Sequence, residues 1–76
     1  MKVLIKVFYT YNEHECLQKG VFPVNYKVYR ESPDLAAADS AKVFVETIQR
    51  MFPEMDLLEV LYEDDKDITD LVKERL

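Results

Sequence analysis

Apolar and polar positions alternate most clearly at the start of the chain, in Lys2–Tyr11. One face of an extended segment there carries the apolar and aromatic residues Val3, Ile5, Val7, Tyr9 and Tyr11. A repeat of two is typical of a β-strand with one buried face, so we predict a strand over residues 2–11. The polar and charged segment Asn12–Gly20 follows, and it predicts a flexible connection.

Two later segments show the same repeat and predict two further strands. The first is Phe22–Arg30, where one face carries Val24, Tyr26 and Val28 and the other Asn25, Lys27 and Tyr29. Its connection to the first strand is too short for a helical crossover, so we expect antiparallel pairing. The second is Asp56–Glu63, where Leu58, Val60 and Tyr62 alternate with Leu57, Glu59 and Leu61.

Helical spacing replaces alternation between the second and third predicted strands. The apolar stripe of this helix consists of Ala37, Ala41, Phe44, Val45, Ile48 and Phe52. Ser32–Asp34 favours a helix start, and Pro53 ends the helix at about Phe52. After the acidic turn Glu63–Asp67, a short C-terminal helix is predicted with Asp67 as its cap. Its apolar residues are Ile68, Leu71, Val72 and Leu76.

These elements predict an α+β fold of order ββαβα, with residues 1–76 as a single small domain. We expect a three-stranded, mainly antiparallel sheet with the main helix packed on one face. The other face is more apolar than a solvated sheet face, since it carries Leu4, Phe8, Tyr29, Leu57 and Leu61. Two coverings are open for it: the short C-terminal helix, or another protein chain, either a second copy or a different protein.

The composition indicates a folded protein of the cytoplasm. Hydrophobic residues make up 49% of the chain, and Cys16 is its only cysteine, so no internal disulfide can form. Small secreted domains usually need such disulfides. Lys6 interrupts the apolar residues near the start, which disfavours a secretory signal, and no apolar run approaches the ~20 residues that span a bilayer.

The net charge of −5 is concentrated in the last third of the chain. Residues 1–53 contain seven Lys and Arg against six Asp and Glu, whereas residues 54–76 contain three against nine. A negative protein is repelled by phosphate backbones and by anionic lipid surfaces. We therefore expect no direct binding to nucleic acid or to a membrane.

Residues with catalytic or metal-binding chemistry are few. His14 and Cys16 are two residues apart and both suit zinc, but a structural site needs about four ligands and the chain has no other His or Cys. A catalytic Cys–His pair would also need an orienting group and an oxyanion hole. One glycine is too few for a phosphate-binding loop. We predict no enzyme and no cofactor, with a metal or thiol site at His14 and Cys16 as an alternative.

These exclusions favour a non-enzymatic protein-interaction module, either a homodimer or a phage-type accessory protein. The predicted binding residues are Phe8, Tyr29, Glu63, Asp64, Asp65, Asp67 and Asp70. A second alternative is nucleic-acid mimicry, in which a row of carboxylates occupies a basic nucleic-acid-binding protein. The simpler interpretation of the acidic row is a solvated face that keeps a small protein soluble.

Overall fold

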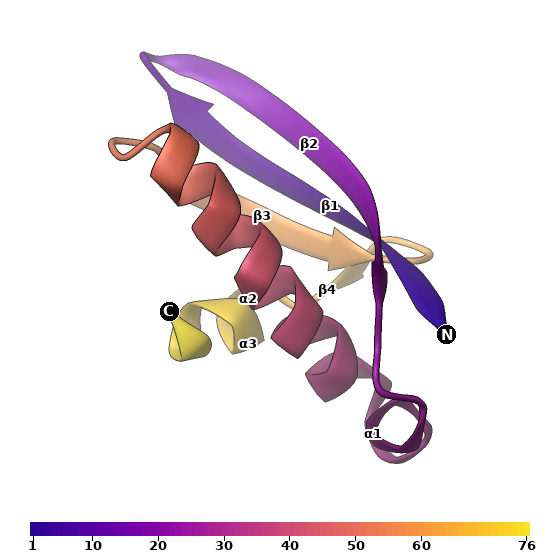
Figure 1. Cartoon of the computed structure of the whole chain (residues 1–76). Coiled ribbons are helices and arrows are strands. Elements are labelled where there is room, and N and C mark those ends of the chain that lie inside the picture. Colours follow the sequence, from indigo (N-terminus) through magenta and orange to yellow (C-terminus); the bar gives the residue numbers. More distant parts are fainter.

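The computed structural model describes residues 1–76 as a four-stranded antiparallel sheet with helices on one face (Figure 1). The strands are β1 (Lys2–Tyr11), β2 (His14–Pro23), β3 (Asp56–Tyr62) and β4 (Lys66–Asp67), in the order β2-β1-β3-β4. The helices are α1 (Tyr26–Glu31), α2 (Pro33–Met51) and α3 (Thr69–Arg75). The predicted α+β class and antiparallel sheet are confirmed, but the prediction of three strands is wrong because it omitted β4 and misplaced β2.

The second strand begins earlier in the chain than its sequence pattern predicts. Asn12 and Glu13 both have positive φ, 52° and 66°, and their two-residue turn joins Tyr11 directly to His14. Turns of this kind match the twist of paired strands and close tight hairpins. Most of the predicted flexible connection over residues 12–20 is therefore β2, which pairs with β1 along ten residues.

Residues 26–31 form α1, although the sequence predicts a strand over residues 22–30. The Asn25 side chain accepts hydrogen bonds from the backbone N–H groups of Lys27 and Val28, at 3.0 and 3.2 Å. These are donors that a helix start leaves unpaired, and the cap outweighs the alternation of three apolar residues. Tyr29 consequently lies on a helix, half-buried against the core, and its predicted place on the second sheet face is wrong.

Helix α2 lies along one face of the sheet and supplies the helical half of the core (Figure 1). Its buried residues are Ala36, Ala37, Ala38, Ala41, Phe44, Val45 and Ile48. The sheet contributes Val3, Ile5, Val7 and Tyr9 from β1 and Val60 and Tyr62 from β3. The helix ends at Met51, close to the predicted end before Pro53. No helix of this chain combines the length and the apolarity needed to cross a bilayer.

The C-terminal helix α3 packs beside α2, on the same side of the sheet. Val72 is fully buried in the common core, and Arg75 Nε donates to Asp39 Oδ1 on α2 at 3.0 Å. The sequence predicts Asp67 as the cap of α3, but the N-cap residue is Ile68; Asp67 lies one residue earlier, where its Oδ1 accepts the Thr69 N–H at 2.9 Å. Of the two coverings predicted for the second sheet face, the C-terminal helix is therefore the wrong one.

A β-bulge in β3 reverses part of the predicted alternation. Phe8 lies opposite Glu59, but the next residue, Tyr9, lies opposite Leu57, so Leu58 is an extra residue in the ladder. Leu57 therefore packs against the core, and Leu58 turns to the other face of the sheet. The predicted assignment of these two leucines is thus inverted.

Candidate interaction surface

The face of the sheet that points away from α2 and α3 is covered by no other element, and we call it the outer face. Its apolar side chains are Leu4, Phe8, Leu17, Val21, Leu58 and Leu61. Leu17, Val21 and Leu58 are 46%, 61% and 45% exposed. A solvated antiparallel face normally carries polar residues at such positions. The outer face is therefore unusually apolar.

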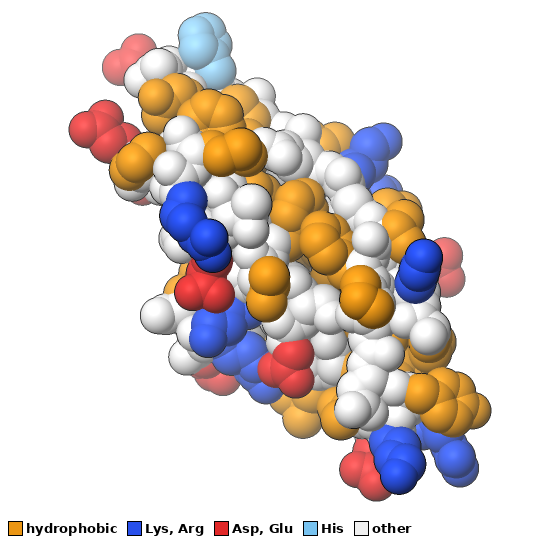
Figure 2. Space-filling view, in the orientation of Figure 1, with side chains coloured by type: hydrophobic (Ala, Val, Ile, Leu, Met, Phe, Trp, Pro, Cys, Tyr) orange, Lys and Arg blue, Asp and Glu red, His pale blue; other side chains and the backbone are white.

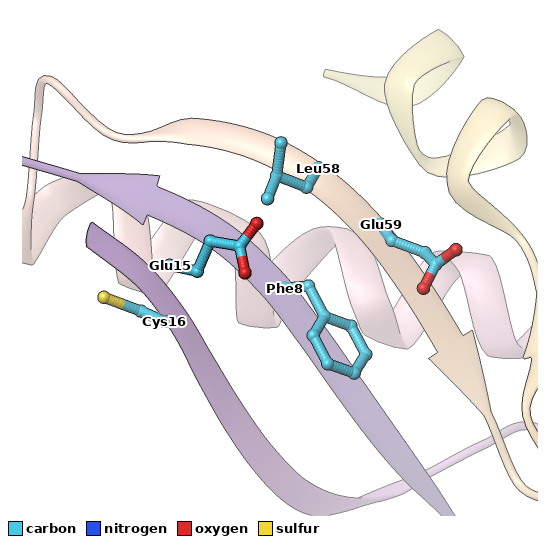
Figure 3. A pocket seen from close by; sticks show the side chains of 5 residues that line it. All are labelled: Phe8, Glu15, Cys16, Leu58 and Glu59. Atoms are coloured by element: carbon cyan, nitrogen blue, oxygen red, sulfur yellow. The ribbon is translucent and has the colours of Figure 1, made fainter. Parts of the chain in front are cut away.

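A shallow hollow of about 310 Å³ lies on the half of the outer face nearer the β1–β2 turn (Figure 3). Phe8 projects into it from β1, and Leu58 and Glu59 border it from β3. Glu15 reaches over β1 from the β2 side, whereas the Cys16 side chain points away from the hollow (Figure 3). The bulge in β3 brings Leu58 to this place, because a regular strand would have turned it toward the core.

Charges of both signs surround the apolar residues of the outer face. Lys6 and Lys19 lie directly opposite each other in β1 and β2. Lys6 Nζ pairs with Asp65 Oδ1 at 2.7 Å, whereas neither Lys19 nor Glu15 takes part in an ion pair. Like charges at opposed strand positions repel, so Lys19 has an unfavourable neighbour and no internal compensation.

Two of the five acidic residues predicted to bind a partner already have partners within the chain. Asp65 is paired with Lys6, and Asp67 Oδ1 accepts both the hydroxyl and the N–H of Thr69, at 2.6 and 2.9 Å. The hydroxyl and then the amide of Thr69 hold the pKa of Asp67 below its ordinary value. Of these five acidic residues, Glu63, Asp64 and Asp70 take part in no side-chain hydrogen bond or ion pair.

The two aromatic residues predicted to bind a partner are not brought together. Phe8 lies on the outer face as predicted, and Tyr29 packs against the core from α1 on the other side. Leu17, Val21 and Leu58 were missed. Asn12 was the one sequence feature that indicated the turn before β2, because Asn adopts positive φ more readily than most residues. It is followed by Glu13 instead of the glycine that is typical of a two-residue hairpin turn, so the turn was not predicted.

His14 and Cys16 lie on the same face of β2, as their spacing requires. Cys16 is half-buried at the margin of the core, and its thiol donates to the His14 carbonyl oxygen at 3.7 Å. His14 is exposed at the end of the hairpin. No three His, Cys, Asp or Glu side chains in the chain come together in an arrangement that could hold a metal ion.

Two further hollows lie outside the sheet's outer face. One, of about 360 Å³, is bordered only by charged residues of α1: Lys27, Arg30 and Glu31. The other, of about 300 Å³, lies where α2 meets the end of β2, and Figure 2 shows hydrophobic side chains along this seam. Ser40 Oγ there donates to the Pro23 carbonyl oxygen at 2.7 Å, a contact that ties α2 to β2.

Comparison with models of protein families, with curated proteins and with solved structures finds no match to this chain. Of the surface features described above, the outer face brings together the largest number of apolar side chains, and they come from three strands. Any function inferred for this surface rests on its geometry and chemistry.

Proposed function

We propose that this chain is a non-enzymatic protein-interaction module that binds another protein through the outer face of its sheet. One observation carries the proposal: α2 and α3 both pack on the same side, so the apolar outer face stays in contact with water. Extended apolar surface on a small protein is typical of an interaction site. Its burial by a partner contributes about 25 cal/mol for each Å² removed from water.

The hollow at Phe8 supports a particular kind of contact. An apolar side chain of the partner would fill it and touch both Phe8 and Leu58, while basic residues beside that side chain would face Glu15 and Glu59. Interfaces commonly combine an apolar centre with a polar rim of this kind. The partner we propose therefore presents an apolar residue flanked by Lys or Arg.

We place this module in the cytoplasm, without direct contact with nucleic acid or membranes. Its single cysteine offers no internal disulfide, and its net charge of −5 opposes binding to anionic surfaces.

Nucleic-acid mimicry has weaker support, because Asp65 and Asp67 are held by Lys6 and Thr69. A metal or thiol site has only His14 and Cys16 to supply ligands, and no third candidate lies with them.

Site-specific photocrosslinking tests the proposal. A photoreactive amino acid replaces Leu58 on the outer face or, as the matched control, Val43 on α2, and both positions are exposed. In extract of the source cells we expect a discrete crosslinked species with another protein from position 58 and none from position 43. Adding Phe8→Asp should abolish that species while the circular dichroism spectrum is unchanged. Equal crosslinking from both positions, or none from position 58, would contradict the proposal.

A further inference from the structure

The two edges of the sheet differ in how far they are closed. β4 pairs with only Leu61 and Tyr62 of β3. Beyond it, the Val60 N–H donates to Thr69 Oγ1 and the Ile68 N–H donates to the Val60 carbonyl oxygen, both at 2.9 Å. β4 and the segment entering α3 therefore cover the β3 edge at Val60, Leu61 and Tyr62. By contrast, β2 has no neighbour along its outer side in ten residues, and such an edge can pair with another strand.

The odd-numbered residues of β2 direct their backbone groups to the open edge. Val24 N–H donates to the Met1 carbonyl oxygen at 3.0 Å, which shows that the even-numbered residues face β1. Pro23 fits this assignment, because it has no N–H to donate and occupies an odd position. The residues whose N–H and C=O groups face the open edge, and whose side chains lie on the outer face, are Glu15, Leu17, Lys19 and Val21.

We propose that β2 pairs antiparallel with β2 of a second copy of this chain, with Leu17 opposite Leu17 of the second copy. In this register Glu15 lies opposite Lys19 of the second copy, and Lys19 lies opposite its Glu15. The opposed pairs formed by Glu15, Leu17 and Lys19 consist of residues whose backbone groups face the open edge, so each of these pairs can exchange two hydrogen bonds, and the pairs between them are non-hydrogen-bonded. This contact goes beyond the proposed function, since it uses the strand edge. Of the charged residues that border the hollow it engages Glu15 alone, and it leaves Phe8, Leu58 and Glu59 free.

Charge complementarity favours this register and a second copy as the occupant, because this register alone places Glu15 opposite Lys19. Shifting the two-fold axis to Lys19 places two lysines opposite each other, and shifting it to Glu15 places two glutamates opposite each other. Both arrangements are repulsive. In the proposed register, the carboxylate from the second copy also offsets the repulsion between Lys19 and Lys6 within each chain. Glu15 and Lys19, neither of which has an ion-pair partner within the chain, are therefore complementary to each other across a two-fold axis.

The two-fold axis at Leu17 also joins the outer faces of the two copies. Because the axis runs perpendicular to the sheet, both copies keep their helices on the same side. The Phe8–Leu17 pair of one chain then lies next to the same pair of the other. The dimer therefore presents one continuous apolar surface, with a hollow on either side of the axis.

A charge-swap series measured by sedimentation velocity at low salt tests this pairing. Glu15→Lys and Lys19→Glu each place like charges opposite each other twice per dimer, and each should raise the dimer dissociation constant about tenfold. The double variant restores opposite charges and should return the constant to within about threefold of the wild type. The matched controls are Glu31→Lys and Lys27→Glu on α1, which change the net charge equally and should leave dimerisation unchanged.

Leu17→Pro provides a second, independent measurement. It removes an N–H that faces the open edge and no hydrogen bond to β1, so we expect a monomer with an unchanged circular dichroism spectrum. Three results would overturn the dimer: a wild type that stays monomeric at about 1 mM, a double variant no tighter than the single ones, or dissociation by Phe8→Asp alone. A monomer that still crosslinks to another protein from position 58 would refute the dimer and leave the proposed function standing. A dimer that responds to the charge swap but gives no such crosslinks would refute the proposed function and leave the dimer standing.

Discussion

Replacing Thr69 by valine should destabilise the fold far more than a change of one oxygen to a methyl group suggests. Thr69 is the only buried polar residue, at 9% exposure. Its hydroxyl accepts the Val60 N–H at 2.9 Å and donates to the Asp67 carboxylate at 2.6 Å. Valine has nearly the same shape and can make neither hydrogen bond.

The expected loss of stability depends on whether water can replace the Thr69 hydroxyl at each of its two hydrogen-bond partners. The Val60 N–H is buried, so leaving it unpaired costs about 1–3 kcal/mol. Asp67 is exposed, and water can replace the Thr69 hydroxyl there, so this loss adds less than ~1 kcal/mol. Together the two losses predict a decrease of about 2–3 kcal/mol in the free energy of unfolding. For a domain of this size that decrease lowers the melting temperature by roughly 10–20 °C.

Urea unfolding followed by circular dichroism at two pH values checks this prediction. The Thr69 hydrogen bonds lower the pKa of Asp67, so their stabilisation is present above the ordinary carboxyl pKa and is lost as the pH falls through the lowered value. The gap between wild type and Thr69→Val should therefore narrow from pH 7 to about pH 2. Thr69→Ser keeps the hydroxyl and should cost only about 1 kcal/mol. A valine variant as stable as the wild type, or no more damaged than the serine variant, would refute the reasoning.

Three other contacts give smaller, separable effects. Tyr62→Phe removes the hydrogen bond from the tyrosine hydroxyl to Asp34 and should lower the free energy of unfolding by about 1 kcal/mol. Burial and the Asp34 carboxylate raise the pKa of Tyr62, so the stability of the wild type falls as the pH rises above about 10. Thermal melts at pH 8–11 should show a less steep fall in the variant. A double-mutant cycle of Lys6→Met and Asp65→Asn should give a coupling free energy below about 1 kcal/mol, since both side chains are partly exposed. The coupling should weaken in about 0.5 M salt, where the Debye length falls to roughly 4 Å, and a larger coupling that salt does not change would contradict this. Asn25→Ala removes the α1 cap and should cost about 1 kcal/mol in urea unfolding, whereas Asn25→Ser should recover most of that loss.

The regular repeats of the sequence were sufficient to predict β1 and α2, but not β2. One face of β1 and one stripe of α2 pack against each other, so burial follows directly from their period. β2 is an edge strand whose residues include Glu15, Lys19 and Gly20, and its solvent exposure leaves little apolar alternation to detect. Its start depends on the turn at Asn12 and Glu13, whose backbone conformation the residue types indicate only weakly.

The composition of the outer face depended on choices that local patterns do not encode. The apolar stripe of α3 suits either side of the sheet, and contacts with α2 decide which side it covers. The bulge at Leu58 shifts the inward–outward alternation of β3 by one residue, and no glycine or turn residue in the sequence indicates it. Phe8 could be placed correctly because β1 is regular up to that point, whereas Leu17 and Leu58 required the tertiary structure.

The covered part of the β3 edge, at Val60, Leu61 and Tyr62, limits how far strand pairing between copies can extend. A sheet with two open edges can add chains without end and grow into a fibre. Here each chain has one long edge to offer, and an antiparallel contact between two β2 strands uses both. Assembly by this route therefore terminates at two chains. Thr69 stabilises the fold by accepting the Val60 N–H. The same hydrogen bond leaves that N–H unable to pair with a strand of another chain at the opposite edge.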